Sequence, residues 1–285
     1  MWGPFGTASE WRPLRRVLLH GPGPELEGLG EPGAVQFLAR PDPRAARREH
    51  EALAAAYRAV GVEVAFVAPE RPTPNLMFVA DLLFMTPSGA ILARPASTVR
   101  AGEEVEVQRA LAALRIPILG AVHGRGVFEG ADALWLDRET VLLATGLRTN
   151  DEGAAQVGRL LSGIGVTVLR VRLGEGTMHL MGTVRILDRD LALVRAATVP
   201  PRVERVLEAR GFEVLRAADE AEAGNRHGMN VVALGPRRIV MPAGCPRTRS
   251  LLEGAGVRCV EVEIGEIAKA AGGIACMTGI LSREG

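Results

Sequence analysis

The feature that most limits how this chain can fold is a repeat of about 50 residues. Five times, an amphipathic segment rich in Ala, Leu and Arg reaches a glycine-like stop, and a short apolar strand follows. A glycine just past the end of a helix supplies the left-handed residue that closes it. The stops lie 54, 50, 46 and 45 residues apart, and they are Gly61, Arg115 (where the other units have glycine), Gly165, Gly211 and Gly256.

Between these units lie paired strand-like runs that flank short polar or Gly/Pro turns, a pattern typical of β-hairpins. The pairs are 78–84 with 90–93, 133–136 with 141–144, 184–187 with 191–194, and 230–234 with 238–241. Each unit therefore reads strand, strand, helix, strand. The first unit lacks a partner for the run 16–20, and we expect the C-terminal run 276–281 to supply it.

Five such units predict an α/β fold with radial repetition: a five-bladed α/β propeller of ββαβ units around a central pocket, with the helices outside. We expect residues 1–285 to form a single domain, because no stretch rich in Pro, Gly or Ser divides the chain.

Composition excludes several classes of function. The 285 residues are 47% hydrophobic and 24% charged with a formal net charge of +1, which favours neither a nucleic-acid nor a membrane surface. No run approaches the roughly 18 apolar residues of a membrane span. Met1–Pro4 lack the pattern of a secretory signal. Three cysteines, Cys245, Cys259 and Cys276, form no C-x-x-C pair, so we expect a cytoplasmic protein without a disulfide framework or a metal site.

A radial fold brings the strand ends of all blades towards one axis, where distant polar residues can meet. Taken singly, each candidate has an ordinary interpretation, such as a satisfied core histidine, a solvated arginine or a small buried cysteine. The candidates are Asp81 in an apolar run, Glu129 and Asp132 on a glycine turn, His179 among apolar residues, Arg100 and Arg148, and Cys276 after Gly272-Gly273.

The order of these motifs resembles the guanidino-group-modifying enzymes of the pentein fold, which include dimethylarginine dimethylaminohydrolase, arginine deiminase and the amidinotransferases. The resemblance extends from Leu14 to Leu281, and the element 94–100 is most similar to the dimethylarginine dimethylaminohydrolase branch. The motifs that carry it are N-L-M-F-V-A-D (75–81), F-E-G-A-D (128–132), R-T-N (148–150), H-L (179–180) and C-M-T (276–278).

The resemblance implies that Cys276 is the nucleophile and His179 the general acid and base, with Glu129 orienting His179 or binding the guanidinium. It also implies a set of substrate-binding residues: Asp81 for the guanidinium nitrogens, Arg100 and Arg148 for an α-carboxylate, Asn75 for the amino end, and Phe78 and Asp132.

These residue types suit the chemistry. Carboxylates match the fork of N–H donors on a guanidinium, and the bound cation favours a thiolate beside it. Attack by the thiolate would release an amine and leave a covalent thiouronium, which water would convert to a ureido product. This route needs no metal or organic cofactor, and its only required partner is a small guanidino substrate.

Two departures from the family pattern leave the substrate open. Met181 stands where deiminases and amidinotransferases typically have an aspartate, and this apolar residue favours an N-methyl group over N–H donors. Ala80 replaces the common Glu or Arg. We therefore expect hydrolysis of a methylated arginine to citrulline and methylamine, with arginine deiminase or amidinotransferase activity as alternatives.

A different class of function is a non-catalytic binding protein, as in ribosome anti-association factors of the same fold. The cysteine, histidine and carboxylate combination argues against it. The oligomeric state, a homodimer included, stays open.

Overall fold

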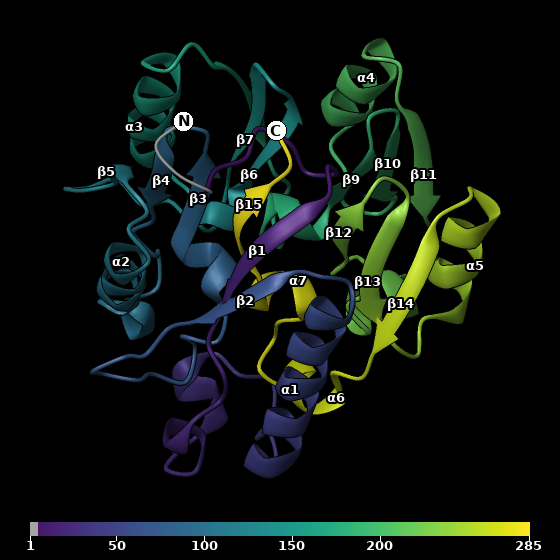
Figure 1. The fold of residues 1–285 in the computed structure, drawn as a ribbon. Helices are drawn as coiled ribbons and strands as arrows, with labels where there is room; N and C mark the ends of the chain where they lie inside the picture. Colours follow the sequence, from purple (N-terminus) through teal and green to yellow (C-terminus); the bar gives the residue numbers. More distant parts are fainter. Residues whose placement is uncertain (1–4) are drawn as a thin grey trace.

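The chain forms five three-stranded sheets, one for each sequence repeat, arranged around a common axis with the long helices outside (Figure 1). This arrangement is that of a computed structural model, which describes residues 5–285. Met1–Pro4, on which the expected lack of a signal segment depended, lie outside the described residues.

The elements follow the predicted order of strand, strand, helix, strand. The first blade holds β1 (Leu14–Leu19), α1 (Pro43–Ala59) and β2 (Glu63–Phe66), and the second holds β3 (Leu83–Thr86), β4 (Gly89–Leu92), α2 (Glu103–Ala113) and β5 (Ile118–Ala121). The third holds β6 (Ala133–Asp137), β7 (Thr140–Thr145), α3 (Asp151–Ser162) and β8 (Thr167–Arg172). The fourth holds β9 (Val184–Asp188), β10 (Leu191–Arg195), α4 (Pro201–Ala209) and β11 (Glu213–Ala217). The fifth holds β12 (Val232–Gly235), β13 (Arg238–Pro242), α5 (Pro246–Gly254) and β14 (Arg258–Val262), and the chain ends with α6 (Gly265–Ala268), α7 (Ile274–Met277) and β15 (Gly279–Arg283).

The two ends of the chain close the ring, as the sequence predicts. Strand β15 pairs antiparallel with β1, from Leu14 opposite Arg283 to Leu18 opposite Gly279. Strand β2 then joins β1 in parallel, so the first blade has the same pattern as the other four: an antiparallel pair and a parallel third strand. The predicted run 276–281 is wrong at its start, because α7 includes Cys276 and the strand begins only at Gly279.

The predicted helix stops are confirmed by their backbone conformation. Gly61, Gly165, Gly211 and Gly256 have φ between 78° and 81°, in the left-handed region. Arg115 has φ 57° at the same place in its unit, so the residue without glycine's freedom adopts the same closing conformation.

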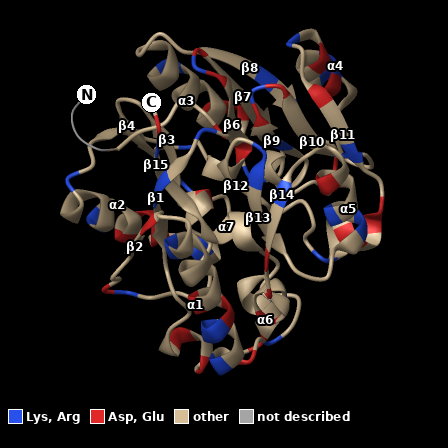
Figure 2. Ribbon diagram, turned by 45° about the vertical axis from the view of Figure 1, so that its right-hand side comes forward, with Lys and Arg blue, Asp and Glu red and all other residues tan. Residues whose placement is uncertain are grey.

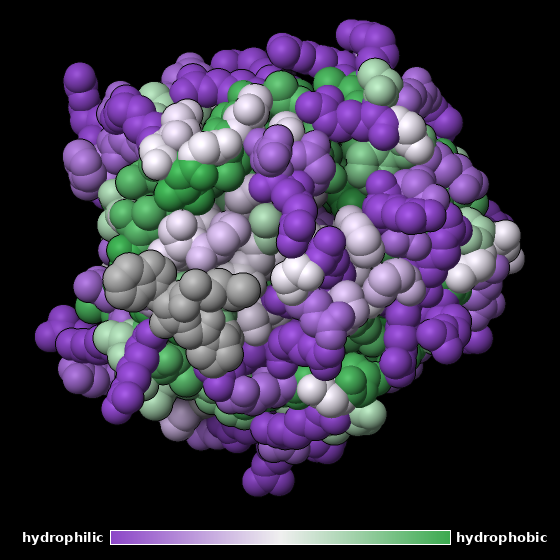
Figure 3. Space-filling view, turned by 45° about the horizontal axis from the view of Figure 1, so that its top comes forward, coloured by the Kyte–Doolittle hydropathy of each residue, from purple (hydrophilic) through white to green (hydrophobic). Residues whose placement is uncertain are grey.

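The outer helices bury one face each. Helix α1 begins after Asp42, whose side chain accepts a hydrogen bond from the Ala45 N–H, with proline in its first turn. It buries Ala46, His50, Leu53, Ala54 and Tyr57, which recur three or four residues apart on one side. Charged residues are frequent along α1, α4 and α5 (Figure 2), and hydrophilic residues dominate the rim of the face in Figure 3.

Neighbouring blades share their apolar side chains. The Trp135 ring of β6 stacks on Phe84 of β3, with centroids 5.7 Å apart, and its indole N–H donates to the Met85 carbonyl. Such contacts fix each blade against the next and so determine which turns face one another near the axis. Within residues 5–285, no helix combines the length and the apolar character that crossing a membrane requires.

One predicted strand is partly wrong. The run 78–84 contains the 3₁₀ turn Val79–Leu82, and β3 begins only at Leu83. All four turn residues are buried, so their apolar sequence looks the same as that of a buried strand.

Candidate active site

Each blade places a polar side chain in the turn that precedes the strand nearest the axis. These turns come within five residues of the start of β3, β6, β9, β12 and β15. The side chains that they present are, in chain order, Asp81, Glu129, His179, Asn230 and Cys276. The repeat of the fold thus brings together residues that are distant in sequence.

Four of these five are expected from the sequence, and Asn230 is the one that was missed. Asn230 precedes β12 as Asp81 precedes β3, so its place in the fifth repeat is the signal that could have found it. The family motifs contain no asparagine there, and an asparagine before a strand resembles any turn residue.

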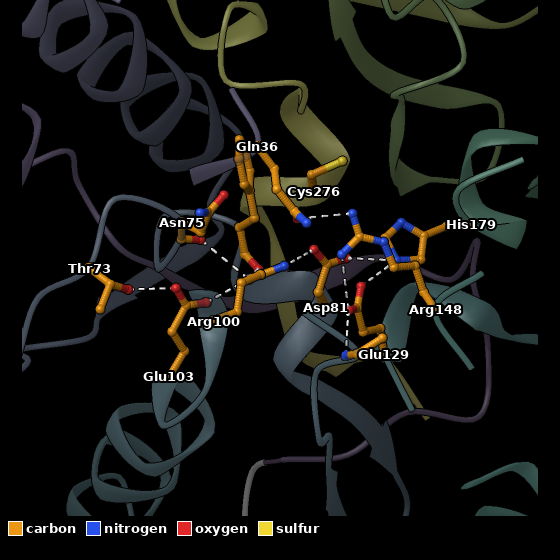
Figure 4. A network of polar contacts seen from close by, with 12 residues as sticks. Gln36, Thr73, Asn75, Asp81, Arg100, Glu103, Glu129, Arg148, His179 and Cys276 are labelled. Atoms are coloured by element: carbon orange, nitrogen blue, oxygen red, sulfur yellow. Dashed lines mark hydrogen bonds and ion pairs between the residues drawn. The ribbon is translucent and has the colours of Figure 1, made fainter. Parts of the chain in front are cut away.

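Four of the five side chains, all but Asn230, line a cavity that we call the central pocket (Figure 4). It brings together eight of the nine site residues expected from the sequence, together with residues from the turn before Cys276. Its lining is Gln36, Asn75, Phe78, Asp81, Arg100, Glu129, Arg148, Met178, His179, Ala270, Ala271, Gly272 and Cys276.

His179 is held by two carboxylates. Its Nε2 lies 2.6 Å from a Glu129 carboxylate oxygen and 3.9 Å from Oδ1 of Asp81. Burial opposes the charged imidazolium, but the charge of Asp81 and the bond to Glu129 outweigh it and raise the pKa of His179 to about 9. The histidine therefore carries a proton that it can donate at neutral pH.

Glu129 is oriented by the motif that contains Arg148. Asn150 caps α3 and accepts a second bond from the Val127 N–H, which anchors the loop before Glu129. The Thr149 hydroxyl accepts from the Glu129 N–H and donates to Asp132 at 2.7 Å. The motif R-T-N thus fixes the backbone on both sides of the carboxylate.

Arg100 has contacts that differ from the expected role. Its guanidinium bonds Asp81 at 2.5 Å and Glu103 at 2.7 Å, and it also donates to the carbonyls of Asn75 and Phe78. Its side chain is 5% exposed. These bonds use four of its five N–H donors, so the expectation that Arg100 binds a substrate carboxylate does not fit them. The contacts instead hold Asp81 in place.

Arg148 keeps donors available. Its side chain is 12% exposed, lies 3.6 Å from Glu129 and donates to the Gln36 amide oxygen at 3.3 Å. Its buried Nε has no hydrogen-bond partner among residues 5–285. This arginine is therefore the better placed of the two for an incoming carboxylate.

The other predicted binding residues fall into two groups. Asn75, which donates its amide N–H to the Val35 carbonyl, and Phe78 line the pocket. Asp132 is 1% exposed, accepts from Thr149 and from the Leu180 N–H, and is absent from the pocket lining in the described structure. The expectation that Asp132 binds substrate does not fit this place, because its carboxylate anchors the turn that carries His179 instead. Burial raises its pKa to about 6.

Cys276 lies in the one-turn helix α7, and the two glycines before it allow close packing. A side-chain carbon on Gly272 would fall 2.3 Å from the Phe78 ring, and one on Gly273 would fall 2.9 Å from Asn230. Neither glycine has a left-handed φ; Ala271, with φ 66°, makes that turn. The two glycines are thus required for close approach to Phe78 and Asn230.

The thiol faces both an amide and the pocket. Asn230 Oδ1 lies 3.1 Å from the Cys276 sulfur and 3.2 Å from its backbone nitrogen. Burial, followed by the charge of Asp81, raises the pKa of the Cys276 thiol to about 11. The resting cysteine is therefore a thiol, and it needs a nearby cation to ionise at neutral pH.

The pocket has an unsatisfied acceptor that suits such a cation. Oδ1 of the buried Asp81 has no hydrogen-bond partner within the described chain. A planar cation with several N–H donors matches this free oxygen.

The same residues contain the one group in the described chain with the spacing of a metal site. Ligand atoms of Asp81, Glu129 and His179 lie within 4.8 Å of one another. Glu129 and His179 already bond each other, and Asp81 bonds Arg100. Binding a divalent cation would therefore require these side chains to give up their present partners.

The remaining sequence expectations have mixed outcomes. Met181 and Cys276 both pack against the core cluster of the first blade, but Met181 does not line the central pocket of the described structure. Ala80 lines a separate cavity and not the central pocket. An alanine in place of the common Glu or Arg therefore removes no charge from the lining of the central pocket. Cys245 is buried before α5, and Cys259 is half-buried in β14.

Comparisons with known proteins show the family to which the chain belongs. A family model described as "N,N dimethylarginine dimethylhydrolase, eukaryotic" matches residues 42–282. The dimethylarginine dimethylaminohydrolase of Pseudomonas aeruginosa is 27% identical over 241 residues, covering 85% of this chain and 90% of that protein. The enzyme of the same name from Streptomyces coelicolor is 28% identical over 271 residues, covering 93% and 96%.

Solved structures extend the likeness to three dimensions. A cysteine-to-serine variant of the Pseudomonas aeruginosa enzyme in complex with citrulline has a TM-score of 0.78 and 26% identity, covering 93% of this chain and 98% of that chain. The amidinotransferase SxtG from Microseira wollei has a TM-score of 0.82, with coverage of 99% and 98%, but 17% identity, which is a likeness of fold alone. The chain therefore belongs to the dimethylarginine dimethylaminohydrolase family, a family of pentein-fold hydrolases that act on C–N bonds of guanidino groups.

Proposed function

We propose that this enzyme hydrolyses an N-methylated arginine to citrulline and a methylamine through a covalent thiouronium on Cys276. The observation that carries the proposal is the unpartnered Asp81 oxygen, which lies in the same pocket as His179 and Cys276. A buried carboxylate oxygen without a donor costs free energy, and a bound guanidinium would remove that cost.

Binding would use the two ends of the pocket differently. Asp81 and Glu129 accept N–H bonds from the guanidinium, and Arg148 meets the α-carboxylate beside Gln36. Arg100 acts indirectly by holding Asp81. The cation lies beside Cys276 and lowers the pKa of its thiol, so substrate itself promotes formation of the nucleophile.

The reaction then needs one proton carrier. The Cys276 thiolate adds to the guanidinium carbon, and protonated His179 gives its proton to the methylated nitrogen as that C–N bond breaks. The amine departs and leaves the thiouronium on sulfur. Neutral His179 next takes one proton from water, whose oxygen adds to the same carbon. The C–S bond then breaks to release the thiolate, and the ureido product gives its remaining extra proton to solvent.

Met181 favours a methylated substrate over arginine. It stands where deiminases and amidinotransferases typically have an aspartate, and it lines a cavity that Cys276 also lines. A thioether makes favourable contact with a methyl group but leaves an N–H donor without an acceptor. Arginine deiminase is the second candidate, and it differs only in the substituent on the leaving nitrogen.

A product assay tests the proposal. Purified enzyme is incubated with arginine, monomethylarginine, asymmetric dimethylarginine and agmatine, and citrulline, ammonia and methylamines are measured. We expect citrulline and a methylamine from the methylated substrates at higher kcat/KM than ammonia from arginine. Preference for arginine would identify a deiminase, and no turnover of any substrate would contradict hydrolysis.

The variant Cys276→Ser provides the control. It should lose at least about a thousandfold in kcat, because a serine hydroxyl is a far weaker nucleophile here, while calorimetry still detects substrate binding. The matched variant Cys259→Ser, at a thiol outside the pocket, should retain the activity of the natural enzyme.

A further inference from the structure

A second cavity lies on the other side of the catalytic pair, and we call it the outer chamber. Its volume is about 320 Å³, against about 40 Å³ for the central pocket. Met178, His179, Ala271 and Cys276 line both. The thiol and the imidazole therefore lie at the boundary between a small charged space and a large second space.

The central pocket already contains every group needed for the amino-acid end and the guanidinium. Asp81, Glu129 and Arg148 all line it, and none of them lines the outer chamber. A guanidinium is planar with three nitrogens: one carries the amino-acid chain, one can be held by the carboxylates, and the third must face His179 to receive a proton. A substituent on that third nitrogen points past His179, and the outer chamber is the space there.

The chamber is larger than a methylamine requires. By the same measure it has about eight times the volume of the central pocket. Dimethylamine has three heavy atoms. A subsite that served only N-methyl groups would leave most of this volume to water.

The wall of the chamber favours an uncharged occupant. Apolar side chains come from Met178, Met181 and Met229, and flexible thioethers adapt to different shapes. The guanidinium of Arg195 is paired with Glu220, with Nε 2.9 Å from a carboxylate oxygen. Burial lowers the pKa of His227, so it is neutral at pH 7. Glu175 is exposed and adds its charge to the solvent side.

We propose that the outer chamber is a leaving-group subsite that accepts uncharged N-substituents larger than methyl, such as linear alkyl or hydroxyalkyl groups. The enzyme would then act on N-alkylated guanidines as a class, and the amine it releases would vary with the substituent. This inference rests on the proposed function, since it assigns a place to the nitrogen that leaves.

Gly182 offers a way to narrow the chamber without strain. It lines the chamber, its φ is not left-handed, and no heavy atom of the described chain lies within 4 Å of where a side-chain carbon would start. Gly182→Leu would therefore extend into free space. Gly174 has the same open surroundings but does not line the chamber, so Gly174→Leu is a matched control.

The experiment compares kcat/KM for monomethylarginine and for Nω-butylarginine, both measured by citrulline release. In the natural enzyme we expect the two values to lie within about tenfold of each other. In Gly182→Leu, kcat/KM for the butyl substrate divided by kcat/KM for the methyl substrate should fall at least thirtyfold. In Gly182→Ala this ratio should fall less. In Gly174→Leu it should stay within threefold of its value in the natural enzyme. Thermal unfolding of each variant checks that it is folded.

Two results would overturn the subsite. One is a natural enzyme that turns over monomethylarginine but processes the butyl substrate more than a thousandfold less well. The other is a butyl-to-methyl ratio that Gly182→Leu leaves unchanged. Failure with monomethylarginine as well would be a different result, because it removes the proposed function itself. Calorimetry gives an independent test by measuring how tightly Nω-butylarginine binds to the inactive variant Cys276→Ser. Binding that weakens when Gly182→Leu is added to this variant supports the subsite, and equal binding to the two variants overturns it.

Discussion

The side-chain oxygen of Asn230 lies 3.1 Å from the sulfur of Cys276 and 3.2 Å from its backbone nitrogen. A backbone N–H can only donate, so it orients the amide of Asn230 with its oxygen towards the sulfur. The thiol must then be the donor in the bond to Asn230. This contact stabilises the protonated cysteine and also fixes the position of α7.

Replacing Asn230 should separate these two effects. Asn230→Ala removes the acceptor and should speed alkylation of Cys276 by iodoacetamide at pH 8, because the thiol pKa falls. It should also lower kcat/KM by about ten- to a hundredfold, since a buried N–H loses its partner and the nucleophile loses its position. Asn230→Asp keeps an acceptor but adds a negative charge, and it should slow alkylation.

Peptide mass spectrometry can follow alkylation at Cys276 separately from Cys259. Alkylation rates that change in the same direction in both variants would indicate that Asn230 acts only on packing.

The value of kcat/KM should be highest at alkaline pH. In the proposed mechanism the reactive form has a thiolate together with an imidazolium, whereas burial and the neighbouring charges raise the pKa of His179 to about 9 and that of Cys276 to about 11 in the free enzyme. Below about pH 9 both groups are protonated, so activity rises as one proton is lost; above about pH 11 the second proton is lost and activity falls. The groups that set these values are Asp81, Glu129, Asp132, Arg100 and Arg185.

A profile measured from pH 6 to 11 on monomethylarginine should therefore increase through neutrality. A maximum below pH 7 would show that the resting pair is already a thiolate and an imidazolium, contrary to the raised thiol pKa.

The two arginines should respond differently to truncation. Arg148→Ala should raise KM for carboxylated substrates at least tenfold more than for agmatine, because its free donors face the pocket. Arg100→Ala should impair both substrates alike and destabilise the fold by about 3 to 5 kcal/mol, because it leaves Asp81 and Glu103 buried without their cation. Steady-state kinetics and urea unfolding of the two variants check these expectations. If Arg100→Ala lost activity only on carboxylated substrates, Arg100 would be a carboxylate binder after all.

Gly272→Ala tests the packing of the nucleophile turn. The added methyl would fall 2.3 Å from the Phe78 ring, so either the ring or the turn must move. We expect kcat/KM to fall by about a hundredfold, as a shift of about 1 Å at the reacting group can cause. Gly254→Ala, in a helix with open space around it, is the control and should leave kinetics unchanged. Normal kinetics in Gly272→Ala would show that Phe78 yields without moving Cys276.

The sequence by itself determined the architecture of this protein. Local backbone preferences are short-range, so the helix stops at Gly61 and Arg115 and the apolar runs of each unit could be identified without coordinates. The repeat then required a radial fold, and the missing strand of the first unit required the C-terminus to close it. The family motifs identified Cys276, His179 and Glu129, which the structure places on one pocket.

Only the tertiary structure decided which partner each polar group has. Asn230 and Cys276 are 46 residues apart, and Arg100 and Asp81 are 19 apart, so their contacts depend on how blades and turns pack. A sequence motif cannot show whether an arginine's donors are already occupied or whether a carboxylate such as Asp132 faces a cavity or a backbone N–H. Those outcomes depend on distances of a few ångströms across the axis, which packing between blades sets and local preferences do not.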